Sequence, residues 1–194
     1  MMNNTHQAKL VSCMNAFRGK LLVTFITALS SLSTAWSADW KSELASQSAL
    51  LGHRNMIIVA DSAYPIQTGT GVKVISTNAP HLEVVQAVAK AIASSPGIVA
   101  LPALDKEFSF IPENYAPGAA KLRESIVKSL ATRGPIREEL HATLLKEVNQ
   151  TAAEYAVIVF KTTGTIPYSS VFFTLDCGYW SPEAEKVLRE NMAK

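Results

Sequence analysis

Short apolar runs alternate along residues 39–194 with longer segments in which apolar side chains recur every three or four positions. The run NMIIVAD (55–61) is continuously apolar between its polar ends, which is typical of a strand covered on both faces. Further strands are predicted at residues 72–76, 97–104, 155–161 and 170–176.

Helical spacing is clearest where Val85, Val88 and Ile92 fall on one face of a predicted helix. The C-terminal segment opens with Ser-Pro-Glu, which supplies an N-cap, a first-turn proline and an early acid. The predicted helices cover residues 39–51, 80–94, 118–134, 137–150 and 181–194.

The alternation of strands and helices predicts one α/β domain over residues 39–194, with a mostly buried central sheet flanked by helices. Residues 105–117 (DKEFSFIPENYAP) interrupt it as a long loop rich in acidic and aromatic residues. Loops of that length inside a compact domain are usually functional, so we expect this one to contribute to function.

Residues 1–38 have the composition of a secretory signal peptide. Basic residues precede the apolar run LLVTFITALSSLSTA (21–35), and small residues near 35–38 suit cleavage. An uncleaved anchor is the alternative, although the run is short for a bilayer span. We therefore expect a periplasmic or secreted protein with no stable membrane insertion after removal of the signal.

The formal net charge of +2 depends on that segment, because it contains Lys9, Arg18 and Lys20 and no acidic residue. Without these three, 15 of the 18 basic residues remain against 16 acidic ones, a net charge of −1. No basic patch is left to bind phosphates, so nucleic acid is not an expected partner.

The sequence contains no Walker loop, GxGxxG, HExxH or CxxC motif. Beyond the predicted signal its histidines are His53, His81 and His141, and their spacing suits no local metal site. We therefore expect neither a metal ion nor a cofactor.

His53 and Asp61 bracket the apolar run 56–60. An imidazole can transfer a proton near neutral pH, and an aspartate at a strand end can accept hydrogen bonds from sugar hydroxyls. A helix-capping histidine and a turn-forming aspartate fit the same pattern, so a structural role for both stays open.

Two later segments also carry candidate chemistry. Asp105 and Glu107 begin the long loop, where a solvated acidic loop is the alternative to a binding role. Tyr168 lies in the turn between the last two predicted strands. Its ring can pack on a sugar face while its hydroxyl hydrogen-bonds, or it can simply cover a hydrophobic rim.

Together these segments resemble the D-ribose pyranase / L-fucose mutarotase family. Its members carry Leu-Gly-His, an apolar strand ending in Ala-Asp and then a proline, as do LGH (51–53), Asp61 and Pro65 here. Near their C-termini they carry a Thr-Gly-Glu turn and Pro-Tyr-x-Asn before a strand, and the same place here reads KTTGTIPYSS (161–170).

Two shorter matches add candidate residues. LDKE (104–107) is similar to a loop of the fucose mutarotase branch that carries a ligand-binding aspartate, which implies such a role for Asp105. LHATLLK (140–146) resembles a segment of the ribose branch that carries a substrate-contacting histidine, which implies the same for His141.

The resemblance implies an isomerase for sugar mutarotation, in which a cyclic hemiacetal opens and recloses as the other anomer or ring size. That reaction needs an acid at the ring oxygen and a base at the anomeric hydroxyl, without metal or cofactor. The resemblance implies His53 as the catalytic proton-transfer residue, and as monosaccharide-binding residues Asp61, Asp105, His141, Tyr168 and Ser170.

The chain departs from the family pattern at two positions. Gly164 stands in place of the turn glutamate and Ser170 in place of the asparagine, and a serine hydroxyl has a shorter reach and only one donor. A non-catalytic exported module that binds a monosaccharide such as ribose or fucose is therefore the alternative.

His53 and Asp61 are eight residues apart. Because an extended strand rises about 3.3 Å per residue, they could lie more than about 20 Å apart in one subunit. A site shared between neighbouring subunits would bring both to one sugar. The resemblance accordingly implies a homo-oligomer, a pentamer or decamer, with sites at subunit clefts.

Overall fold

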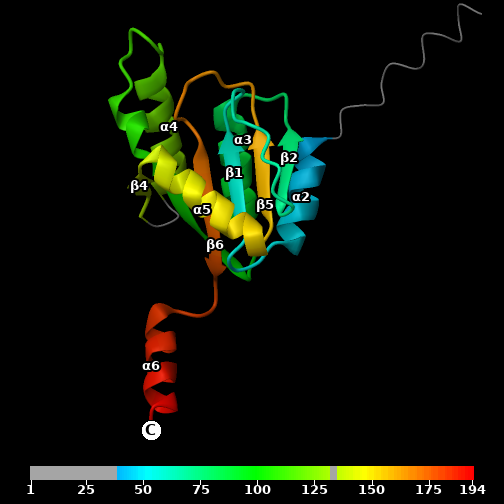
Figure 1. Cartoon of the computed structure of the whole chain (residues 1–194), viewed down its shortest axis with the longest axis vertical. Helices are drawn as coiled ribbons and strands as arrows, with labels where there is room; N and C mark the ends of the chain where they lie inside the picture. Colours follow the sequence, from blue (N-terminus) through cyan, green and yellow to red (C-terminus); the bar gives the residue numbers. More distant parts are fainter. Residues whose placement is uncertain (1–38, 132–134) are drawn as a thin grey trace, which may run out of the picture. The chain divides into compact units, whose positions relative to one another are not determined.

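The computed structural model describes residues 39–131 and 135–194, and within them six strands form one mixed sheet (Figure 1). The strand order is β2-β5-β1-β6-β3-β4. β6 is antiparallel to both of its neighbours, β1 and β3, whereas the other neighbouring strands pair in parallel. The strands are β1 (Met56–Ala60), β2 (Val72–Ser76), β3 (Ile98–Asp105), β4 (Arg137–Glu139), β5 (Val157–Lys161) and β6 (Val171–Cys177).

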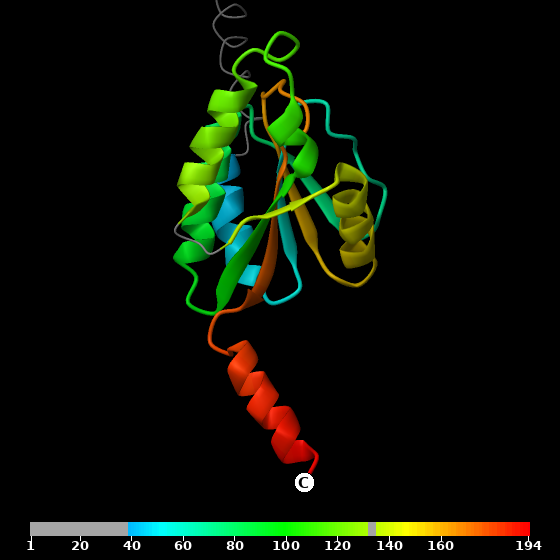
Figure 2. The same ribbon diagram turned by 90° about the vertical axis from the view of Figure 1, so that its left-hand side faces the viewer.

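Helices cover both faces of this sheet, as the two views show (Figures 1 and 2). α2, α3 and α4 pack against one face in a core that includes Ile57 and Val59 of β1. α5 packs against the other face, in a second core that includes Met56, Ile58 and Ala60. The helices are α2 (Trp40–Leu50), α3 (His81–Ala93), α4 (Ala119–Leu130), α5 (His141–Glu154) and α6 (Pro182–Met192), with the short 3-10 helix η1 (Lys106–Phe110) after β3.

β1 is the central strand of both cores, and all five of its residues are buried. Successive side chains of a strand point to opposite faces, so a strand between two helical layers must be apolar at every position. The sequence MIIVA meets that requirement, which explains why it forms a continuous apolar run. The predicted α/β domain with a mostly buried central sheet is therefore confirmed.

One predicted helix begins in the wrong place. Residues 137–150 were expected to form a single helix, but Arg137–Glu139 form β4, which pairs in parallel with Ala103–Asp105 of β3. The side chain of Arg137 pairs with Glu147 on α5, so the two charged residues hold the short edge strand beside the helix. The helix starts instead at His141, one residue beyond Leu140.

The loop predicted at residues 105–117 is also partly ordered. Its first residue, Asp105, is the last residue of β3, and η1 follows directly. Phe108 of η1 is buried in the same core as α3 and α4. This anchoring holds the start of the loop rigidly at the end of β3.

The predicted signal peptide, residues 1–38, lies outside the described residues and stays a prediction. Of the helices in the described ranges, none is long and apolar enough to cross a membrane. α6 begins as expected, with the Ser181 hydroxyl accepting a hydrogen bond from the backbone N–H of Ala184. It has no buried residue against the described part of the chain.

The tight contact of Gly71 with α5 predicts a stability difference between two glycine variants. A Cβ at Gly71 would lie 2.8 Å from the carbonyl oxygen of Tyr155 and closer still to that of Ala152. Because backbone atoms must move to admit it, Gly71→Ala should lower the free energy of unfolding by about 1–3 kcal/mol.

Gly97→Ala is the matched control, because a Cβ there meets no atom within 4 Å. It should leave stability unchanged or raise it by about 0.4–1 kcal/mol, since alanine restricts the unfolded chain. Urea unfolding of both variants measures the difference. Equal effects of the two substitutions would contradict the packing described here.

Candidate functional site

Polar side chains gather at one end of the sheet, where the parallel strands end and β6 begins. We call this end the carboxyl edge. Ligands of open α/β sheets bind outside the carboxyl ends of the strands, so this is the expected place for a site. The predicted site residues that lie at this edge are Asp61, Asp105, His141, Tyr168 and Ser170.

His141 contacts both Asp105 and Tyr168, and we call the three residues the carboxyl-edge cluster. Nδ1 of His141 lies 2.9 Å from Oδ1 of Asp105. The rings of His141 and Tyr168 meet edge to face, with their centroids 5.4 Å apart. Tyr168 keeps 41% of its surface exposed, so the cluster runs from a buried carboxyl to an accessible aromatic ring.

The carboxyl group of Asp105 is held in an unfavourable environment. Its side chain is fully buried, and its Oδ2 has no hydrogen-bond partner among the described residues. Burial raises the pKa of Asp105 to about 6, the hydrogen bond and charge of His141 oppose the rise, and nearby Glu107 adds to it. A buried oxygen without a partner is costly.

Glu107 fixes the position of His141. Both of its carboxylate oxygens accept from the backbone N–H of His141, at 3.0 and 3.2 Å. That N–H is one of the free donors at the start of α5, where a negative charge is also favourable. The acidic start of the 105–117 loop thus caps a helix, and this cap keeps the imidazole beside Asp105.

Asp61 and Tyr64 lie just after β1. Oδ1 of Asp61 accepts from the backbone N–H of Ala63 at 2.7 Å, which is the turn-forming role considered from the sequence. Tyr64 is buried, and its hydroxyl accepts from Gln67 at 3.0 Å. Burial raises the pKa of Tyr64 to about 12, and the neighbouring charge of Asp105 adds to the rise.

Hydrogen bonds from His81 hold the loop that carries Tyr168. The imidazole of His81 is buried and hydrogen-bonds to the Thr162 hydroxyl at 3.0 Å and to the Ser169 carbonyl at 2.8 Å. Burial lowers the pKa of His81, so its neutral form is favoured. Tyr168 itself has a left-handed φ of 55°, which this support helps to maintain.

The same histidine accounts for one departure from the family pattern. A Cβ at Gly164 would lie 3.0 Å from the Cβ of His81, so a glutamate at that position would press on the imidazole. The second departure, Ser170, is buried, with 1% of its surface exposed. The described part of the chain therefore gives a sugar no direct access to the Ser170 hydroxyl.

A groove of about 440 Å³ adjoins the carboxyl-edge cluster. Glu107 and Tyr168 belong to its lining, together with Phe110, Tyr115 and Leu140, which are largely exposed. Exposed aromatic rings beside hydrogen-bonding groups are a common arrangement for ligands with one apolar face.

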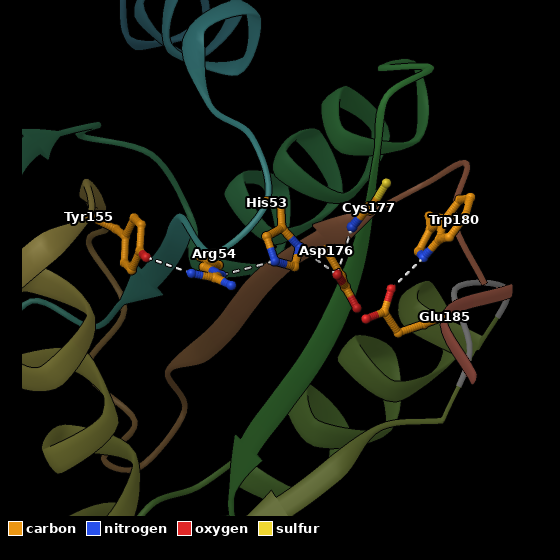
Figure 3. Close-up of polar contacts among 7 residues, drawn as sticks. All are labelled: His53, Arg54, Tyr155, Asp176, Cys177, Trp180 and Glu185. Atoms are coloured by element: carbon orange, nitrogen blue, oxygen red, sulfur yellow. Dashed lines mark hydrogen bonds and ion pairs between the residues drawn. The ribbon is translucent and has the colours of Figure 1, made fainter. Parts of the chain in front are cut away.

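His53 lies at the opposite end of the sheet. It precedes β1, and its Nδ1 is 2.6 Å from Oδ1 of Asp176, near the end of β6 (Figure 3). Nε of Arg54 donates to Nε2 of His53 at 3.1 Å, and Nη1 of Arg54 donates to the Tyr155 hydroxyl at 2.8 Å. Arg54 has a left-handed φ of 73°, which turns the chain sharply between His53 and β1.

A second cavity, of about 700 Å³, opens beside this histidine. His53, Arg54 and Asp176 form one wall, and Trp180 and Glu185 belong to the other. The indole Nε1 of Trp180 donates to Glu185 at 2.8 Å, which fixes the ring (Figure 3).

The structure thus brings five of the predicted residues to one edge and leaves His53 at the other, as the spacing of His53 and Asp61 suggested. The sequence did not indicate Tyr64, Arg54, Tyr155 or Asp176. In the sequence, Tyr64 is recognisable only as part of the turn after β1. Asp176 lies 123 residues from its partner His53, and Tyr155 lies 101 residues from its partner Arg54, so no local pattern points to these contacts.

Comparison with known proteins gives one family. The family model described as "RbsD / FucU transport protein family" matches residues 40–178. No curated protein sequence matches the chain.

Three solved structures of this group are similar to the chain. RbsD from Bacillus subtilis complexed with D-ribose is 20% identical, with 68% of this chain and 89% of that one covered and a TM-score of 0.47. The fucose mutarotase from Streptococcus pneumoniae in complex with L-fucose is 15% identical, with the same coverage and TM-score. FucU from Bifidobacterium longum is 13% identical, with 68% and 90% covered and a TM-score of 0.46.

The buried carboxyl of Asp105 predicts a pH-dependent gain in stability on its neutralisation. Its folded-state pKa of about 6 lies above the ordinary value of 3.8, so its contribution is most favourable below 3.8 and is lost as the pH rises through 6. Asp105→Asn should therefore raise the free energy of unfolding by about 1–3 kcal/mol at pH 8.

The gain should shrink as the pH falls from 6 toward 4, where the wild-type carboxyl is protonated. Urea unfolding between pH 4 and 8 measures it, with the exposed Glu190→Gln as a control that should show no such trend. A stability difference independent of pH would show that the cost of the buried charge is not what distinguishes Asp105.

Proposed function

The chain belongs to the RbsD / FucU transport protein family, and from this premise we propose that it is a mutarotase for a free aldose. The observation that carries the proposal is the carboxyl-edge cluster, in which the buried Asp105 holds the partly exposed His141 beside the accessible ring of Tyr168. A sugar hydroxyl would hydrogen-bond to His141, and the tyrosine ring would cover the sugar's apolar face.

Mutarotation moves protons without net change. A base takes the proton of the anomeric hydroxyl, the C1–O5 bond breaks as the C1 carbonyl forms, and an acid protonates O5. After rotation about the C1–C2 bond, the same steps in reverse close the ring on the other face of C1. Both groups must titrate near the working pH to serve in each direction.

Two groups of this chain suit the two roles. The imidazole of His53 is half exposed and can exchange a proton with the anomeric hydroxyl. Asp105, with its pKa raised to about 6 by burial, can pass a proton to or from the sugar through the partly exposed His141, to which it is hydrogen-bonded. His141, Tyr168 and Asp61 would hold the remaining hydroxyls, since all of them lie at the carboxyl edge.

His53 and the carboxyl-edge cluster cannot reach one sugar within a single chain. β1 separates them, and its five residues with their flanks span roughly 20 Å at about 3.3 Å per residue. We therefore propose a homo-oligomer in which His53 of one subunit faces the carboxyl edge of the next. Such a head-to-tail contact joins two different surfaces and closes into a ring when the rotation permits.

A non-catalytic monosaccharide-binding module of the same fold is the second candidate. Gly164 and the buried Ser170 favour it, because two polar side chains of the family pattern are missing from the accessible surface. The two candidates differ in whether the bound sugar changes its anomeric form.

Exchange NMR on a panel of aldoses separates the two candidates. The wild-type chain should increase the rate of anomer exchange for at least one sugar, and His53→Ala should lower that increase by at least about 100-fold, the usual contribution of a general acid or base. Glu190→Gln, an exposed residue of α6, should leave the rate unchanged. Saturation-transfer binding without faster exchange would favour the binding module instead.

Co-expression of two inactive variants tests the shared site. His53→Ala damages the His53 surface of a subunit and leaves its carboxyl edge intact, whereas Asp105→Asn does the opposite. In a mixed ring, some contacts therefore join an intact His53 surface to an intact carboxyl edge. With random mixing, roughly a quarter of the wild-type exchange rate should return, because each site takes one surface from each of two neighbours.

Each variant assembled alone is the control and should remain inactive. A monomer by light scattering that retains full activity, or a mixture no more active than its components, would be incompatible with a site shared between subunits.

A further inference from the structure

Asp176 is placed to control the imidazole of His53. Its Oδ1 lies 2.6 Å from Nδ1 of His53 and also accepts from the backbone N–H of Cys177 at 2.7 Å. The second contact is local and fixes the direction of the carboxylate near the end of β6. The contact with Nδ1 joins Asp176 of β6 to His53, which precedes the neighbouring strand β1.

The partners of the two ring nitrogens define the tautomer of His53. A carboxylate only accepts hydrogen bonds, so Nδ1 must carry the proton. A guanidinium only donates, so Nε2, which faces Nε of Arg54 at 3.1 Å, must offer its lone pair. The neutral imidazole is thus the Nδ1–H form, with Nε2 as its acceptor.

The other carboxylate of this cavity does not share that role. Both oxygens of Glu185 are engaged, one by the indole of Trp180 at 2.8 Å (Figure 3) and the other by Nε of Arg189 at 2.7 Å. In residues 39–131 and 135–194, Asp176 is the one carboxylate within hydrogen-bond distance of His53.

We infer that Asp176 is a positioning residue that holds His53 as the Nδ1–H tautomer and thereby presents Nε2 as the proton acceptor for the anomeric hydroxyl. The consequence for turnover rests on the proposed mutarotase function, whereas the tautomer does not. In the ring-opening step Nε2 takes the proton of O1–H as the C1–O5 bond breaks, and Asp176 faces the imidazolium that forms. In reclosure the proton returns from Nε2 to O1.

Nε of Arg54 donates to the Nε2 lone pair of His53. Its Nη1 contact with the Tyr155 hydroxyl holds the guanidinium close by, and an incoming hydroxyl replaces only the Nε contact. The positive charge that remains beside O1 stabilises that oxygen as it loses its proton.

The test combines nitrogen NMR of the full chain with anomer exchange. Correlation of the ring ¹⁵N and ¹H signals, with the imidazole neutral, should show Nδ1 protonated in the wild type; the His53 signals are assigned from their loss in His53→Ala. Asp176→Ala should raise the Nε2–H fraction of His53, because it removes the acceptor of the Nδ1 proton. The exchange rate should then fall by about tenfold or more.

Asp176→Glu should restore both the tautomer and most of the rate, because it returns a carboxylate, and Glu190→Gln should change neither. Since Asp176 is 45% exposed at its side chain, these variants are expected to fold, which circular dichroism verifies. An Nε2–H tautomer in the wild type, or an Asp176→Ala chain with unchanged tautomer and rate, would overturn the inference.

The two proposals fail separately. A wild-type chain with the Nδ1–H tautomer that responds to Asp176→Ala, but without faster exchange for any aldose, would overturn the mutarotase function and still support the positioning by Asp176. Faster anomer exchange, together with a His53 tautomer that does not change when Asp176 is substituted, would support the mutarotase function and overturn the positioning by Asp176.

Discussion

The antiparallel pairing of β6 with β1 is the constraint on which both polar regions depend. Each strand has chemistry at both of its ends: His53 before β1 and Asp61 after it, Tyr168 before β6 and Asp176 near its end. Because the strands run in opposite directions, the start of one meets the end of the other. The pairing thus joins His53 to Asp176 at one edge, and it brings Tyr168 to the edge where Asp61 and Asp105 lie.

Much of the fold could be predicted because burial leaves a direct pattern in the sequence. β1 must be apolar at every position between two helical layers, and α3 repeats its apolar residues at helical spacing because only one of its faces is covered. β4 leaves no such pattern. Its residues Arg-Glu-Glu are polar, and they form a strand only because β3 offers an unpaired edge, so the segment was assigned to the following helix.

The candidate site was less predictable, because its contacts join residues that are far apart in the sequence. Asp105 and His141 were suggested by short local motifs, and their contact depends on the parallel strands that end together. The pairing of His53 with Asp176 has no local pattern, because the two residues are neighbours only through the register of β1 and β6. Ser170 illustrates the opposite error. A hydroxyl suits a sugar, but whether it is accessible depends on packing that the sequence does not reveal.

The position of β1 in the sheet also determines how late in synthesis the sheet can be completed. β1 is synthesised early, yet its partners, Val157–Lys161 of β5 and Val171–Thr174 of β6, lie about a hundred or more residues later. Pairings of such high contact order form slowly, and until they form the segment MIIVA has no strand on either side of it. An apolar strand left unpaired during synthesis is prone to aggregate. The strand at the centre of the finished sheet is thus the one that waits longest for its partner strands while the chain is made.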